Sequence, residues 1–450
     1  MKSLSSGNLK LDYARFCIPC VVNLAVFSIY SIVDALFVSR CINSDALAAV
    51  TLSHPFLSLL FCIGITLAVG GSTLIAKALG EKNNDYANFI FSQNLIVTII
   101  ISVLISISVS LLLEPCCALL GASEATMPYT RDYLGTLAPF AMAFVLEYNM
   151  EFLVKTDGNP GLSLFTVIGS SLLNIFLDWL FVAHLDMGTY GAALATGISQ
   201  TLASVTFLSY ILFSKKGLFH FRRFKWNLRI YGKLLALGAA DGSMEILSAL
   251  LILIYNRIMR DNLGTDGVAA FGIVIYISNL VFNMNTGATQ GMEPLVSYHK
   301  GACEQSSCKK LYRYALTVVL ILCAATFISC QLFTEEIIAL FFNDASAKVA
   351  LLAAEGLRVF SYTFLFMGFN LLTSGYMTAQ CKPSFALSIS LGRAFFLHAA
   401  VLLTIVAVLG IDYVWLSSVI SEAAMAVVSF ILLLSFNRLL SRCKDQVRSS

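Results

Sequence analysis

Acidic and polar side chains interrupt several apolar stretches of the chain that are long enough to cross a bilayer. Asp34 lies in the first stretch and Asp178 in the fifth, and Asn174 precedes Asp178 by four residues, which places both on one helical face. A carboxylate at the centre of a membrane helix costs about 2.5–3.5 kcal/mol, so its presence indicates a function. With Thr196 of the sixth stretch, these side chains predict an oxygen-rich site that holds Na⁺ or shares a proton. The alternative is that both acids lie near span ends and are simply hydrated.

The second half of the chain contains its own intramembrane charges. Asp241 and Glu245 are four residues apart, and Glu245 lies deeper in the seventh stretch, whereas Asp241 fits a hydrated boundary position. Arg393, in the eleventh stretch, is interpreted as a structural cation paired with backbone carbonyls or an acid, with gating as the alternative. Glu293, Arg393 and Tyr30 are therefore candidates for substrate contact or gating.

Other chemistries lack the residues that they need. Glu147 and Glu151, four residues apart near the inner end of the fourth stretch, are expected to face a cytoplasmic vestibule. The five histidines are dispersed and form no His-Glu-x-x-His pair, and no phosphate-binding lysine motif occurs. We expect no cofactor, no bound nucleic acid and no enzymatic activity, and an ion gradient rather than ATP as the source of energy.

The composition requires these residues to be positioned by membrane helices. Hydrophobic residues make up 58% of the 450 residues and charged residues only 12%, about half the usual share of a soluble domain. A span needs about 20 apolar residues. We predict twelve spans, near 14–38, 48–75, 90–113, 134–154, 162–183, 190–213, 234–256, 268–292, 314–333, 358–378, 385–409 and 413–436. The first is too long for the apolar part of a signal peptide and is expected to remain.

Basic residues predict the orientation of the spans. With the amino terminus inside, 22 of the 29 Lys and Arg fall in cytoplasmic segments, so both termini are expected in the cytoplasm. The basic segment 215–233 is interpreted as a linker at the membrane surface rather than a nucleic-acid patch. The twelve cysteines are scattered through apolar stretches and are interpreted as core residues. Cys17 and Cys20 have the spacing of a redox pair, but they open an apolar helix, which disfavours that chemistry.

The chain contains a duplication. At an offset of 221 residues, segment 45–80 aligns with 266–301 without a gap, and Asp45, Gly70 and Gly80 align with acidic or glycine residues. At an offset of 222, a second block places Gly188 on Gly410. We predict two six-helix lobes, 1–214 and 234–450, joined by 215–233. Since six is even, the lobes are related by an axis along the membrane normal, as in many secondary transporters.

Short motifs along nearly the whole chain resemble a known family. They are Pro19 with Tyr-x-x-Val-Asp at 30–34, Asp-x-x-Ala-Ala-Val at 45–50, Gly-Gly-Ser-Thr at 70–73, Asp-Gly-Asn-Pro at 157–160, Leu-Asn-Ile-Phe-Leu-Asp at 173–178, Gly-Ala-Ala-Leu-Ala-Thr at 191–196 and Gln-Gly-Met-Glu-Pro at 290–294. The sequence is thereby similar to the multidrug and toxic compound extrusion (MATE) family, and more narrowly to its MepA-like branch.

The resemblance implies a two-lobed exporter that exchanges H⁺ or Na⁺ for amphipathic organic cations. It places the amino-lobe cation site at Asp34, Asn174, Asp178 and Thr196, with Glu245 as the carboxy-lobe acid. Some relatives carry a second acid in the tenth span, where residues 359–378 here have none. We expect a monomer in the cell membrane whose partners are organic cations, the coupling cation and lipid. A flippase of a lipid-linked precursor is the alternative within transport.

Overall fold

The computed structural model of the chain describes residues 4–42, 44–124, 126–214, 217–222, 226–339 and 347–449. Every regular element in these ranges is helical. The first helices are α1 (Leu9–Cys41), α2 (Ser44–Gly80), α3 (Asn84–Leu111), α4 (Leu113–Leu119), α5 (Met127–Leu137), α6 (Ala141–Thr156), α7 (Pro160–Asp178) and α8 (Gly188–Phe213). They are followed by α9 (Leu228–Gly301), α10 (Gln305–Leu332), α11 (Thr334–Ala339), α12 (Ala347–Phe360), α13 (Phe364–Ala379), α14 (Pro383–Leu391), α15 (Leu397–Val408) and α16 (Leu416–Ser449).

Short irregular helical turns join some of these helices into single spans. A 3₁₀ turn at Ala138–Phe140 connects α5 to α6, and one at Ser361–Thr363 connects α12 to α13. Two π-helical segments occur in the part of the chain described here, Trp179–His184 directly after Asp178 and Gly392–Phe396 around Arg393. π-Helical turns often mark functional positions.

Eleven helical stretches of the described ranges are long and apolar enough to cross a membrane. One of them, α9, has 74 residues, far more than one span needs. Gly264 interrupts it with φ 68° and ψ −155°, a conformation that glycine adopts without strain. Tyr255 before the break and Phe271 after it stack with ring centroids 4.8 Å apart, which shows that the chain folds back at Gly264. Counting α9 as two spans gives the twelve that the sequence predicts, and the all-helical membrane fold is confirmed.

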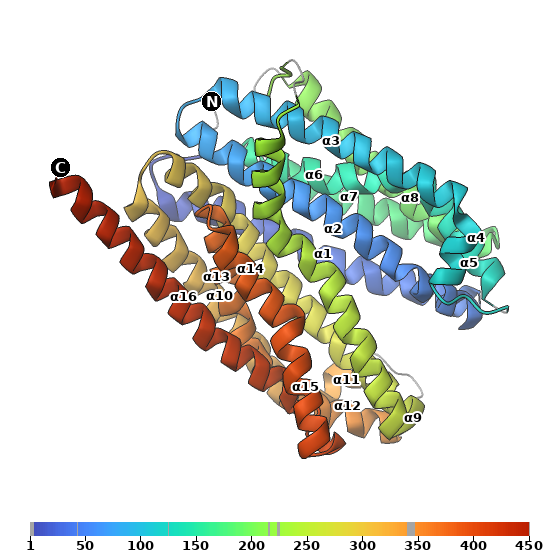
Figure 1. Cartoon of the computed structure of the whole chain (residues 1–450). Helices are drawn as coiled ribbons and strands as arrows, with labels where there is room; N and C mark the ends of the chain where they lie inside the picture. The colour runs from blue at the N-terminus through green and yellow to red at the C-terminus, as the bar shows by residue number, and fades with distance from the viewer. Residues whose placement is uncertain are drawn as a thin grey trace.

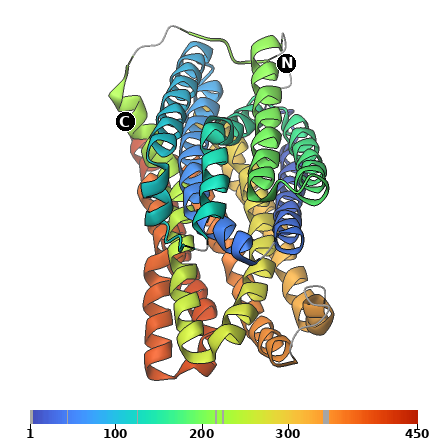
Figure 2. The same cartoon turned by 90° about the vertical axis from the view of Figure 1, so that its right-hand side faces the viewer.

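The helices gather into two groups (Figure 1). Helices α1 to α8 form the first group and α9 to α16 the second, and the groups meet mainly where α1 and α2 pack on α9. Both termini lie at the same end of the bundle, at the top of Figure 2, which we call the terminal end.

The apolar core shows where the groups are joined and where they separate. Near the terminal end a single core contains side chains of both groups, among them Phe16, Met150, Met292 and Leu311. Toward the opposite end the core divides into one cluster within the first group, around Leu60 and Tyr133, and one within the second, around Tyr255 and Trp415. The molecule is therefore closed at the terminal end and divided at the other.

The segment between the groups is partly fixed to the first group. Leu218 N donates to Asp157 Oδ1 at 2.6 Å, and His220 N donates to Asn88 Oδ1 at 2.8 Å. The ring of Phe219 stacks on Phe91 with centroids 5.0 Å apart. Burial raises the pKa of Asp157, although the hydrogen bonds from Leu218 and Tyr210 oppose this shift. The described part of the predicted linker thus packs against α3 and the end of α6.

Candidate functional site

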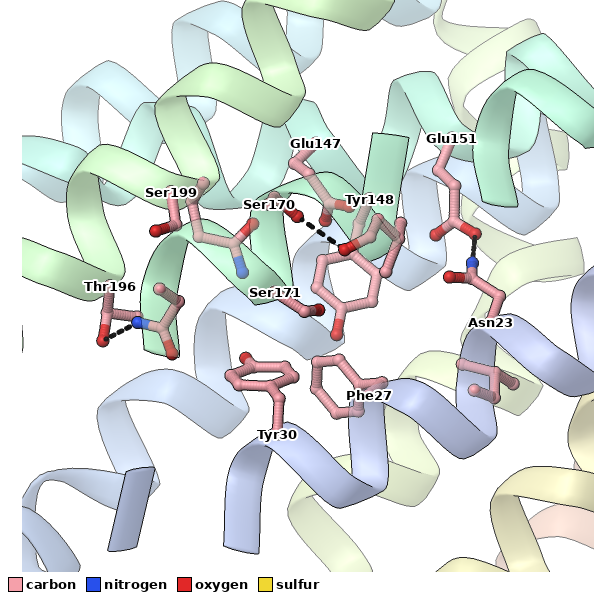
Figure 3. A pocket seen from close by; sticks show the side chains of 14 residues that line it. Asn23, Phe27, Tyr30, Glu147, Tyr148, Glu151, Ser170, Ser171, Thr196 and Ser199 are labelled. Carbon is pink, nitrogen blue, oxygen red and sulfur yellow. Dashed lines mark hydrogen bonds between the residues drawn. The ribbon is translucent and has the colours of Figure 1, made fainter. Parts of the chain in front are cut away.

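A small polar pocket lies inside the first helix group (Figure 3). Its volume is about 30 Å³, enough for one water molecule or one small ion. It is lined by Asn23, Leu24, Phe27, Tyr30, Glu147, Tyr148, Glu151, Val167, Ser170, Ser171, Asn174, Thr196, Ser199 and Gln200. These residues come from α1, α6, α7 and α8, so four helices meet at this pocket, which we call the amino pocket.

The amino pocket brings together three of the predicted site residues. Asn174, Thr196 and Tyr30 line it, and Asn174 Nδ2 donates to Thr196 Oγ1 at 3.5 Å. Asp178 is completely buried one helical turn from Asn174 but is not among the lining side chains. Asp34 belongs to α1, and its side chain lies outside the described residues. The assignment of a cation site to Asp34, Asn174, Asp178 and Thr196 therefore stays a prediction.

Two acids that were expected to face a cytoplasmic vestibule, Glu147 and Glu151, line the amino pocket beside Asn174 and Thr196. Glu147 and Glu151 follow one face of α6, and each is 5% exposed. Glu151 Oε1 accepts from Asn23 Nδ2 at 2.5 Å and from Ser163 Oγ at 3.0 Å. Figure 3 shows Asn23 and Glu151 pointing toward one another at one side of the pocket. The sequence signal for this arrangement was the i,i+4 pair on α6; its contact with Asn23 on α1 was not foreseen.

The pocket presents more acceptors than donors. Asn23 Oδ1 and Asn174 Oδ1 are buried and have no hydrogen-bond partner among the described residues. In the same ranges, the Glu147 carboxylate forms no hydrogen bond or ion pair. Amide and carboxylate oxygens are the ligands that a hard cation prefers, and a carboxylate can alternatively take a proton. The arrangement is chemically suited to bind Na⁺ or H⁺.

A larger cavity separates the two helix groups. Its volume is about 420 Å³, and its lining includes α1, α2, α6 and both parts of α9. The acids on it are Glu151, Asp241, Glu245 and Glu293, and the aromatic residues are Phe27, Tyr30, Phe61, Tyr133, Phe144, Tyr148, Phe152, Tyr276 and Phe282. We call it the central cavity. The predicted residues Tyr30, Thr196, Glu245 and Glu293 all line it.

Arg393 lies behind the central cavity rather than in its lining. Its guanidinium lies 5.4 Å from the ring centroid of Phe282, a cavity residue, and forms an ion pair with Glu422 of α16, N to O 2.8 Å. Glu422 Oε2 also accepts from Asn370 Nδ2 at 2.6 Å. The ion pair agrees with the interpretation of Arg393 as a cation paired with an acid. Which acid it is, and the contact with Asn370, could not be predicted, because the three residues lie on different spans.

Breaking this buried pair is expected to destabilise the protein. The Arg393 and Glu422 side chains are 8% and 5% exposed, so Glu422→Gln leaves a cation in apolar surroundings, which costs about 3–5 kcal/mol. The double variant R393M/E422L should lose much less, because it leaves no buried charge. Thermal unfolding of detergent-solubilised protein measures both. Equal losses in the single and double variants would show that the pair is not the source of the effect.

The second group contains a neutral counterpart of the predicted cation site. The offset of 221 places Tyr255 at the position of Asp34, and the offset of 222 places Ser418 at that of Thr196. In the structure the Tyr255 hydroxyl lies 2.8 Å from His398 Nε2 and 3.0 Å from Ser418 Oγ. His398 Nε2 in turn lies 3.0 Å from Ser418 Oγ. Hydroxyls and an imidazole replace the acids here, so the two helix groups differ in charge at equivalent positions.

Comparison with known sequences gives two kinds of match. A family model described as MatE matches residues 19–180 and 244–404, more than half of the chain. A Multidrug export protein MepA of Staphylococcus haemolyticus is 25% identical over 435 residues, 94% of this chain and 93% of that protein. Its namesake in Staphylococcus saprophyticus is 25% identical over 369 residues, 81% of this chain and 80% of that protein.

Solved structures share the fold. The outward-facing conformation of a multidrug resistance MATE family transporter of the MOP superfamily superposes with a TM-score of 0.92 at 22% identity, covering 97% of each chain. A MOP superfamily transporter from Pyrococcus furiosus superposes with a TM-score of 0.88 at 23% identity, over 94% of this chain and 95% of that one.

Proposed function

Because this chain belongs to the MatE family, we propose that it is a secondary active exporter that exchanges H⁺ or Na⁺ for amphipathic organic cations by alternating access. It is a multi-pass membrane protein. The observation that carries the proposal is the lining of the central cavity, where four acids stand among nine aromatic side chains. Aromatic faces and carboxylates both attract an organic cation, and the rings also contact its apolar part. The relatives named multidrug export proteins support this choice of cargo.

We propose that the two helix groups are the moving lobes, 1–214 and 234–450, with 215–233 as their linker. The excess of Lys and Arg in the segments at the terminal end supports a cytoplasmic position for that end and for both termini, in a cell membrane. With the terminal end in the cytoplasm, the closed core near it and the divided core opposite correspond to an outward-facing conformation. The protein is proposed to work as a monomer.

The amino pocket is the proposed site of the coupling cation. One face of α6 presents Glu147, Glu151 and Lys155, each four residues after the one before. Glu151 pairs with Lys155, so the charge of Glu147 is left without a basic partner when both acids are ionised. In low dielectric such a charge is costly until H⁺ or Na⁺ neutralises it. We propose that the cation site extends from Asp34, Asn174, Asp178 and Thr196 to Glu147.

The flippase alternative is not favoured. A lipid-linked precursor carries phosphate groups, which require Lys or Arg in the binding cavity. Among the described residues that line the central cavity there is none. The side of the cavity formed by α9 instead presents the acids Asp241, Glu245 and Glu293, which would repel phosphate groups.

Glu245→Gln should weaken binding of an organic cation by roughly tenfold or more, because one carboxylate facing the central cavity is neutralised without a change of shape. Binding of a fluorescent lipophilic cation to purified protein, followed by anisotropy, measures the loss. A neutral dye of similar size should bind both proteins equally. Glu355→Gln, an exposed acid on α12, is the matched control. Equal cation affinity in the wild type and the Glu245 variant would contradict the proposed cargo site.

The exchange itself is tested in vesicles that contain the purified protein. An inward gradient of H⁺ and an inward gradient of Na⁺ are imposed in separate experiments. The gradient that drives the fluorescent cation out of the vesicles identifies the coupling ion. Cation efflux that ignores both gradients would overturn the proposed function.

A further inference from the structure

Lys155 is a buried lysine between the two helix groups. It lies in the last turn of α6, where its side chain is 3% exposed. Its ammonium pairs with Glu151 Oε1 at 2.7 Å and lies 4.8 Å from the ring centroid of Phe152. Removing a lysine from water costs several kcal/mol unless it is paired, so this residue is held in place by specific partners.

One of these partners belongs to the other helix group. Lys155 Nζ donates to Gln290 Oε1 of α9 at 3.3 Å. Gly291, which follows Gln290 on α9, packs directly against the backbone of α1. A Cβ atom at this position would lie 2.7 Å from Cys17 Cα. Tyr13 of α1 donates its hydroxyl to Ala288 O of α9 at 3.2 Å. Lys155 thus takes part in the closed contact of α9 with α1, α2 and α6 near the terminal end, which we call the terminal interface.

The other partner belongs to the amino pocket. Asn23, Ser163 and Lys155 all contact Glu151 through its Oε1 atom. Among the described residues, Oε2 has no hydrogen-bond partner, and Glu151 lines both the amino pocket and the central cavity. A cation bound between Glu147 and Glu151 would therefore share a carboxylate with the Lys155 ammonium. Two positive charges at one carboxylate repel each other strongly in low dielectric.

We propose that Lys155 links occupancy of the amino pocket to the terminal interface. With the pocket empty, Lys155 neutralises Glu151 and holds Gln290, and the terminal interface stays closed. A cation in the pocket displaces the ammonium from Glu151, the contact with Gln290 is lost, and α9 separates from α6 and α1. The inference rests on the proposed function, which supplies the cation, and adds the residues that transmit its arrival.

The test uses two native cysteines at the terminal interface. Cys17 and Cys20 of α1 are 4% and 0% exposed, and Gly287 and Gly291 of α9 cover them. Their alkylation by N-ethylmaleimide, located by peptide mass spectrometry in vesicle-embedded full-length protein, reports opening. Cys117, buried within the first group at the other end, reports unfolding.

In the wild type without Na⁺ at high pH, alkylation of Cys17 and Cys20 should be slow, and Na⁺ added at the same pH should accelerate it. Low pH should accelerate it as well once each rate is divided by the rate for denatured protein at that pH, because only the thiolate reacts. Gln290→Leu removes the acceptor and keeps the Glu151–Lys155 pair. It should accelerate alkylation without cation by roughly tenfold, the factor for one lost hydrogen bond to a charged group. Lys155→Met should do the same and abolish the response to cation. Arg257→Met, which removes the exposed pair with Asp261, is the control.

Wild-type rates in both variants, with Cys117 protected, would overturn the proposal. If Lys155→Met exposes Cys117, that variant is unfolded. Gln290→Leu alone then tests the proposal, because it leaves every buried charge paired as in the wild type. The result is independent of cargo. Vesicles in which no gradient drives export, combined with accelerated alkylation in Gln290→Leu, would refute the exchange function and keep the link between Lys155 and the interface.

Discussion

Asp178→Asn is expected to reduce gradient-driven export by at least about tenfold while leaving folded protein in the membrane. The Asp178 side chain is fully buried in α7, so its charge acts on a bound cation without screening by water. Asparagine has the same shape but no charge, which removes the attraction for the coupling ion and preserves the packing. Transport of a fluorescent cation into and out of vesicles with an imposed H⁺ or Na⁺ gradient measures the loss. Asp34→Asn should behave in the same way.

The matched control is Asp186→Asn, the same substitution at an exposed position after α7. It should transport at the wild-type rate. Glu147→Gln separates the two parts of the proposed site, because Glu147 lines the amino pocket and Asp178 does not. A loss of coupling in both Asp178→Asn and Glu147→Gln would support one extended site. Gradient-driven export that survives Asp178→Asn would remove this residue from the mechanism.

The spans could be predicted from the sequence because lipid imposes a simple rule. Every backbone group must be paired within its own helix, so length and apolarity are enough to locate a span. The predicted span 162–183 corresponds to Pro160–His184 in the structure. The break in α9 also had a signal, since Gly264 falls between two apolar stretches. What hydropathy cannot give is the tilt of the helices, and hence the division of the core at one end only.

The partners of the buried charges could not be predicted in the same way. Lys155 is one of the 22 basic residues assigned to cytoplasmic segments, because it lies at the end of a predicted span. In the structure α9 covers it, and its contact with Gln290 joins residues 135 positions apart. The pair Arg393–Glu422 likewise depends on which faces of two spans meet. The cluster around Tyr255 could have been predicted, because the repeat offset alone aligns Tyr255 with Asp34. A repeat predicts equivalent positions but not the chemistry that each half places there.

The terminal interface depends on backbone contact between α2 and α9, and Gly238→Val is expected to prevent its closure. A Cβ atom on Gly238 would lie 1.8 Å from Thr66 O, and one on Gly70 of α2 would lie 2.0 Å from Leu234 O. Two such contacts one turn apart leave no room for a side chain, so valine must push the helices apart. Since the proposed outward-facing conformation requires this closure, export should fall by at least about tenfold, a cost of about 1.4 kcal/mol or more.

The control for this substitution is Gly232→Val on the same helix, where a Cβ atom would meet nothing within 4 Å. It should transport normally. Alkylation of Cys17 and Cys20 should increase in Gly238→Val, because α1 and α2 both contact α9 at the terminal interface, whereas buried Cys117 should stay protected if the protein is folded. Wild-type export and protected Cys17 and Cys20 in Gly238→Val would mean that the helices can separate there without cost. The close packing of α2 on α9 would then be irrelevant to transport.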